Sequence, residues 1–335
     1  RGLEDETIVS LLRERIAEVL GARMEVTFPE GVALDPRVSR VCLQSPDQTL
    51  GGNLEGVGRG TRFDLGSEMG FLRTASYWSM GSQPSRNVWF DNGWTFMDAD
   101  WTAMGATCWS AERFTKSSMR TVFRGRVEAG YGERIGAGAV FSGDPVNSQD
   151  LEGRGCQMID LYPDILRRLG VRYGVWTILS YNKIAFSDAA DVLATLQVGK
   201  DPEKGKLFEP SRALLSLPVS GRGLTACIGV LDLGSLEDPK LELHYADLPL
   251  PLNTESADRN DDRMKELIPA AMEHLEAMPS IADLFANAPA PRTGQTPLKV
   301  LLDDKDAAVE GRAWIFNRVN PESRIDPVDL SEILA

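Results

Sequence analysis

The first hydrophobic pattern along the chain is helical and covers residues 5–20. Its apolar residues recur at the spacing of one helix face: Ile8, Leu12, Ile16 and Val19. Charged residues lie between them, which is typical of an amphipathic helix. Gly21 follows, and because glycine commonly ends a helix, we expect the helix to stop there. Residues 26–60 are rich in Pro, Gly, Asp and Asn, which predicts a linker and a domain boundary near residue 60.

The pattern changes to strand spacing between about residues 62 and 250. Short runs rich in Val, Ile and aromatic residues alternate there with glycine-rich or acidic turns, which is typical of packed sheets. The runs that we interpret as strands are Phe71–Trp78, Val88–Met97, Ala103–Ser110, Ala137–Phe141, Met158–Leu161, Val171–Tyr181, Val192–Val198, Ala213–Leu217, Thr225–Asp232 and Leu241–Tyr245. Large side chains on both faces of the Val171–Tyr181 run favour a β-sandwich. A short helix is expected just before it, over Tyr162–Gly170.

The last part of the chain is helical and extended. The segment Asp258–Met278 has a helical apolar stripe, although Pro269 should kink or restart that helix. A Pro-rich linker, two short apolar runs and a terminal helical turn follow, at residues 287–297, Leu298–Leu302, Ala313–Phe316 and Val328–Leu334. The sequence therefore predicts three parts: an N-terminal helix and linker at 1–60, a sandwich at 62–250, and a C-terminal helical and extended tail at 255–335.

Composition narrows the function classes. The 335 residues are 42% hydrophobic and 25% charged, enough for a sizeable core. A formal net charge of −13 opposes binding to nucleic acid and to an anionic membrane, and favours cations and basic protein partners. No apolar run approaches the ~20 residues that span a bilayer. The four cysteines stand far apart without CxxC spacing, so we expect a reducing compartment, the cytoplasm. The chain begins at Arg1 rather than Met, which indicates a processed or partial chain.

The sequence lacks the usual parts of an enzyme. Its two histidines, His244 and His274, are thirty residues apart in unlike contexts, which disfavours a catalytic triad or a multi-histidine metal site. No GxxxxGK[ST] or GxSxG motif occurs. We therefore expect no catalytic activity. Paired carboxylates leave one alternative open, a metal-dependent hydrolase, but no pattern brings a particular pair together.

One segment concentrates oxygen ligands between two strands, FSGDPVNSQDLE at residues 141–152. Calcium takes six to eight oxygens from carboxylates, amides and carbonyls, and a flexible loop of this composition supplies them. The alternating register of an EF-hand is missing. A second cluster, Asp91–Gly93, precedes an acidic pair, Asp98 and Asp100. Because Asp, Asn and Gly also favour turns for backbone reasons alone, both clusters could be ordinary turns.

The order of four segments resembles the TerD-like family of tellurium-resistance and chemical-stress proteins. These segments are VWFDNGWTFMDAD (88–100), AVFSGDPVNSQDLEG (139–153), MIDLYPDILRRLGVRYGVWTILSYN (158–182) and AFSDA (185–189). The resemblance covers about residues 62–250. It implies a β-sandwich whose inter-strand loops bind Ca²⁺, without established catalytic activity. It also implies protein partners, including AAA ATPases and proteins with von Willebrand-type domains.

The resemblance also identifies candidate metal ligands. They are Asp144, Asn147, Asp150, Asp91 and Asp160. Asp144 matches the aspartate of the family's SGD motif and would be the principal ligand, and Asp160 matches the acid that begins the next element. Trp89 stands where the family has the first aspartate of its DLD motif, which removes one ligand from the set.

These observations favour a non-catalytic, calcium-binding stress-response or conflict-system module that acts through protein–protein interactions. Two alternatives remain open at this point: the carboxylate-based hydrolase, and a structural subunit of a homo-oligomeric assembly whose flanking helices make the contacts.

Overall fold

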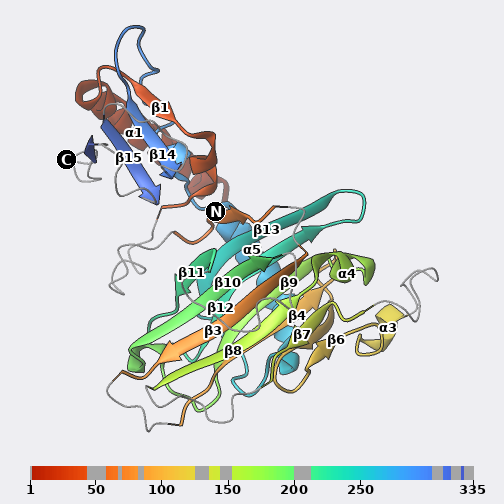
Figure 1. Cartoon of the computed structure of the whole chain (residues 1–335). Coiled ribbons are helices and arrows are strands. Elements are labelled where there is room, and N and C mark those ends of the chain that lie inside the picture. Colours follow the sequence, from red (N-terminus) through yellow and green to blue (C-terminus); the bar gives the residue numbers. More distant parts are fainter. Residues whose placement is uncertain are drawn as a thin grey trace. The chain divides into compact units, whose positions relative to one another are not determined.

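The computed structural model describes residues 2–43, 58–66, 70–81, 87–124, 136–143, 153–199, 213–303, 312–317 and 326–327 (Figure 1). Contacts divide the chain into two compact units. The terminal unit combines Arg1–Leu43 with Met278–Ala335, and the central unit is Gln44–Ala277. Composition predicted boundaries at residues 60 and 255. It did not predict that the two ends of the chain form one unit.

The central unit contains two antiparallel sheets. The first has the order β11-β10-β3-β8-β7-β6. Its strands are β3 (Phe71–Ser79), β6 (Arg113–Phe114), β7 (Ala139–Phe141), β8 (Arg154–Leu161), β10 (Asp191–Gly199) and β11 (Leu215–Pro218). The second has the order β2-β13-β12-β9-β4-β5. Its strands are β2 (Arg62–Asp64), β4 (Phe90–Met97), β5 (Ala103–Thr107), β9 (Tyr173–Ser180), β12 (Thr225–Gly234) and β13 (Pro239–Leu248).

Large apolar side chains from both sheets form one core between them. Trp94 of β4 stacks on Trp176 of β9, with ring centroids 5.5 Å apart, and Trp78 of β3 meets Phe90 of β4 edge-on. These four side chains are fully buried in a shared cluster. The mainly β, sandwich-type fold predicted from the sequence is therefore confirmed. All ten predicted strands are present with shifted ends. Strands β2 and β6 were not predicted, because they are too short to show a periodicity.

A helical layer covers the other face of the second sheet. It consists of the short 3-10 helix η6 (Ala257–Arg259) and helix α5 (Asp261–Glu276). Four side chains of α5 pack against the sheet in a separate apolar cluster: Met264, Ile268, Met272 and Leu275. Strands β9 and β12 are thus buried on both faces, which explains their nearly continuous apolar sequences.

Two expectations about this helix are corrected. Helix α5 runs through Pro269, so the expected restart of the helix at this residue is wrong. A proline inside a helix costs about 3 kcal/mol, and burial of the apolar stripe offsets that cost. The helix, which composition assigned to the C-terminal tail, belongs to the central unit.

The terminal unit is built on a parallel sheet with the order β1-β14-β15-β16. Its elements are α1 (Gly2–Thr27), β1 (Val32–Leu34), η1 (Pro36–Arg40), α6 (Ile281–Leu284), β14 (Leu298–Asp303), β15 (Arg312–Asn317) and β16 (Asp326–Pro327). Residues from both ends of the chain share its core, including Met24, Phe28, Ile281 and Leu298. The apolar runs at 298–302 and 313–316 form strands, as expected, and the predicted turn at 328–334 lies outside the described residues.

Helix α1 continues past Gly21 to Thr27, so the expected stop at this glycine is wrong. A Cβ added at position 21 would lie 2.9 Å from Asn287 Cβ and 3.0 Å from the Asn287 carbonyl oxygen. The glycine therefore lets the segment at residue 287 approach the helix backbone.

The remaining described helices are short: α3 (Thr121–Arg124), α4 (Pro163–Arg168) and η3 (Phe186–Asp188). Helix α4 confirms the short helix predicted before β9. Among the described residues, no helix is both long enough and apolar enough to span a bilayer.

Candidate functional site

Asp91, one of the predicted ligands, lies inside the sandwich rather than in a turn. It belongs to the part of β4 that β5 does not reach, because the pairing with β5 begins at Trp94. Its carboxylate accepts a hydrogen bond of 3.0 Å from Gln157 Nε2, and the residue is 4% exposed. Gln157 belongs to β8 of the first sheet, so this contact joins the two sheets.

The neighbouring Asn92 is the centre of a buried hydrogen-bond network. Its backbone amide donates to Gln157 Oε1 at 3.0 Å, and its Nδ2 donates to the Thr74 carbonyl at 3.1 Å. Trp176 Nε1 donates to Asn92 Oδ1 at 2.7 Å, and Trp94 Nε1 donates to Thr74 Oγ1 at 2.9 Å. Buried polar groups with satisfied hydrogen bonds fix one arrangement of a core. The network therefore holds the sheets together, and Asp91 is part of it.

Asp160, a second predicted ligand, is paired with Arg73. Arg73 Nε and Nη2 donate to the two carboxylate oxygens at 2.7 and 2.8 Å. This bidentate bond raises the pKa of Arg73. Because Asp160 and Gln157 are three residues apart on β8, their side chains point to opposite faces of the sheet. The structure therefore does not bring Asp91 and Asp160 together, and a metal at Asp160 would compete with Arg73 for the same carboxylate.

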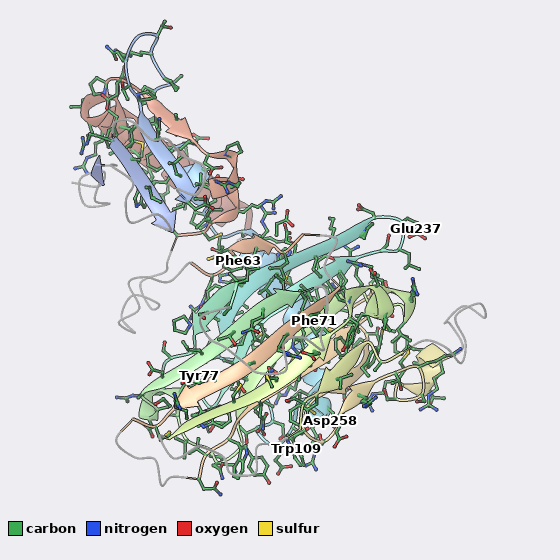
Figure 2. The ribbon with its side chains drawn as sticks, in the orientation of Figure 1. Phe63, Phe71, Tyr77, Trp109, Glu237 and Asp258 are labelled. Atoms are coloured by element: carbon green, nitrogen blue, oxygen red, sulfur yellow. The ribbon has the colours of Figure 1, made fainter. Side chains whose placement is uncertain are left out.

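The guanidinium of Arg73 also lies over the ring of Phe71, 5.7 Å from its centroid. Phe71 and Tyr77 are both labelled along β3 in Figure 2. Since alternate residues of a strand share a face, these side chains and Arg73 line the outer face of the first sheet.

The other three predicted ligands, Asp144, Asn147 and Asp150, lie outside the described residues, so the loop site stays a prediction. Within the described part of the chain, no group of three or more His, Cys, Asp or Glu side chains could hold a metal ion.

Two thiols of the central unit are unsuited to nucleophilic chemistry. Burial raises the pKa of Cys156 to about 12, with a smaller opposing effect from Arg73, and burial also raises the pKa of Cys227 to about 12. Because the thiolate is the reactive form, these groups stay protonated and inert at neutral pH.

A hydroxyl cluster connects β5 to η6 (Asp258 and Trp109 are labelled in Figure 2). Ser110 Oγ donates to Asp258 Oδ1 at 2.9 Å, and Ser256 Oγ bonds to the same oxygen. Cys108 Sγ lies 3.3 Å from each hydroxyl. These hydrogen bonds fasten the helical layer to the sheet. Sequence reasoning missed it because its halves are about 150 residues apart.

The most distinctive exposed feature of the terminal unit is an apolar face of α1. Five side chains, each between 44% and 82% exposed, make up what we term the outward face: Ile8, Leu12, Ile16, Val19 and Val26. Met24 and Phe28, on another side of the helix and just past its end, are buried in the core of the unit. The stripe recognised in the sequence is real, but it points away from the core of its own unit.

Comparisons with known proteins add little to this geometry. No family model matches the chain, and no curated protein matches it. Among solved structures, one similar chain is a homologue of the telluride resistance protein TerD from Streptomyces coelicolor A3(2), at 10% sequence identity. The alignment covers 54% of this chain and 92% of that chain, with a TM-score of 0.34. A likeness at this TM-score carries no argument about function.

Proposed function

We propose that the chain is a non-catalytic binding module that acts through protein–protein contacts, with the outward face of α1 as a contact surface. The observation that supports the proposal is this row of five exposed aliphatic side chains, on a helix that also exposes Leu11. Exposed apolar groups are common singly, but a contiguous row on a charged, water-soluble surface marks an interaction site. Helix faces of this kind bind partners through anchors spaced three and four residues apart.

The cellular setting of the proposal is stress response, and it rests on the resemblance of four sequence segments to the TerD-like family. The same resemblance supports AAA ATPases and von Willebrand-type proteins as partner classes, and a calcium-dependent loop at residues 144–150. The acidic charge of −13 is compatible with basic protein partners and disfavours nucleic acid.

Site-specific photo-crosslinking tests the contact surface. A photoreactive amino acid replaces Ile16, in the outward face, or Glu14, an exposed residue of the same helix outside that face. We expect a specific crosslinked protein from position 16 and none from position 14 when the full chain is irradiated in its host cells. Equal labelling from both positions, or none from either, would show that the outward face binds no protein.

A further inference from the structure

Five of the exposed residues of α1 follow the spacing of a coiled-coil seam. Leu12, Ile16, Val19 and Val26 form a column together with Arg23, at intervals of four, three, four and three residues. Alternation of three and four is the heptad pattern by which two helices pack along each other. All five residues of this column are exposed. The column therefore resembles one side of a coiled-coil interface, to which a second helix would supply the other side.

The opposite side of α1 is already occupied. Gly21 lies against Asn287, and Met24 is buried in the core of the terminal unit. A helix with apolar residues on more than one side is normally covered on each of them. The core of the terminal unit covers one side, so the column needs a second helix.

The charges along α1 indicate which helix fits. Arg23 stands within the column near its C-terminal end, and the sequence carries three acidic residues in a row, at positions 4–6, near the other end. A parallel copy of α1 would bring Arg23 against Arg23. An antiparallel copy brings Arg23 to the acidic positions, and in the same register sets Leu12 against Ile16 of the second copy. Opposite charges across a helix seam select orientation and partner.

We infer that the chain self-associates through α1, which packs antiparallel against α1 of a second copy. This inference rests on the proposed function, because it names the partner of the outward face. The face is small. Five aliphatic side chains, about half exposed, offer on the order of 300 Å² per copy, against the ~800 Å² per partner of a standard stable interface. The dimer should therefore be weak and concentration-dependent.

Sedimentation velocity of the full chain tests self-association. We expect the weight-average mass to rise from that of one chain toward twice that value between about 1 μM and 1 mM, the range of weak affinities. The double substitution Leu12→Glu with Ile16→Glu should keep the chain monomeric. Glu14→Gln, on the same helix but outside the column, should associate like the unmodified chain. Because all these positions are exposed, circular dichroism and thermal melting should be unchanged. An unmodified chain that stays monomeric at every concentration would overturn the inference.

Orientation requires its own measurement. In the antiparallel register the two Val26 positions are 24 residues apart along the seam, about 36 Å, whereas a parallel pair would bring them within about 10 Å. A nitroxide at Val26→Cys, measured by electron spin resonance with the labelled native cysteines as background, distinguishes these distances. Arg23→Glu should weaken the antiparallel pair at least several-fold. A distance near 10 Å, or tighter association of Arg23→Glu, would contradict the antiparallel pairing.

The crosslinking experiment separates failure of this inference from failure of the proposed function. A product of twice the chain mass from position 16 supports self-association. A product with only a different protein supports the proposed function and overturns the second copy as the partner.

Discussion

Replacing Asn92 by alanine should lower the free energy of unfolding of the central unit by more than the loss of one hydrogen bond between the sheets would. The substitution removes the acceptor of Trp176 Nε1 and the donor to the Thr74 carbonyl. Trp176 is fully buried, so its N–H would lose its partner without gaining water. An unsatisfied buried group costs about 1–3 kcal/mol, and two of them give an expected loss of about 2–6 kcal/mol. This is a large share of the ~5–15 kcal/mol that stabilises a typical domain.

Urea unfolding followed by tryptophan fluorescence measures this loss, as a lower midpoint at an unchanged slope. A double-mutant cycle isolates the hydrogen bond. Trp176→Phe should cost about 1–2 kcal/mol less in the Asn92→Ala background than in the unmodified chain, because the N–H that it removes is already unpaired.

Trp78 provides the matched control, since its Nε1 is buried without a hydrogen-bond partner among the described residues. Trp78→Phe should therefore be additive with Asn92→Ala within about 0.5 kcal/mol. Additive effects for Trp176→Phe as well would show that the Asn92–Trp176 bond does not hold the sheets together.

Three further predictions concern the terminal unit and the loop. Gly21→Ala should destabilise by about 1–3 kcal/mol in thermal melts, because its Cβ would meet Asn287; stabilisation by about 1 kcal/mol, the ordinary helix gain, would refute that contact. Burial tends to raise the pKa of Asp35, but hydrogen bonds from Arg37 lower it overall. The resulting stability is present above the ordinary Asp pKa of about 3.9 and lost as pH falls below it, and Asp35→Asn should lack this loss in acid titrations. Calcium at ~100 times its dissociation constant should add about 2.7 kcal/mol, and Asp144→Asn should abolish the gain; equal melting temperatures with calcium and with chelator would exclude the site.

The strands of the sandwich could be predicted because burial on two faces leaves a strong signal in the sequence. All ten residues of β12 are buried, and its run of Val, Ile and Leu stands out between turns. The partners of Asp91 and Asp160 could not be predicted, because they depend on strand register. Arg73 faces Asp160 only when β3 pairs with β8 in the observed alignment.

The fate of the apolar stripe on α1 shows another limit of sequence reasoning. Periodicity revealed that Ile8, Leu12, Ile16 and Val19 share one face. It could not show whether that face meets its own chain or another molecule, because both produce the same spacing. Among the described side chains of α1, the one that is buried is Met24, which packs against residues from the other end of the chain. No local sequence pattern predicts such a long-range contact.

The parallel pairing of Val32 with Leu298 sets an order of events during synthesis. Strand β1 leaves the ribosome early but cannot pair until β14 has been translated, 266 residues later. The strands of the central unit all emerge in the interval, so the central unit can fold while its flanking segments wait. During that interval, α1 lacks the part of its core that Ile281, Leu298 and Val300 supply, and its buried side is open to chaperones. A chain that ended at Ala277 would therefore contain every described strand of the central unit, preceded by a helix that lacks its core partners from the C-terminal segment.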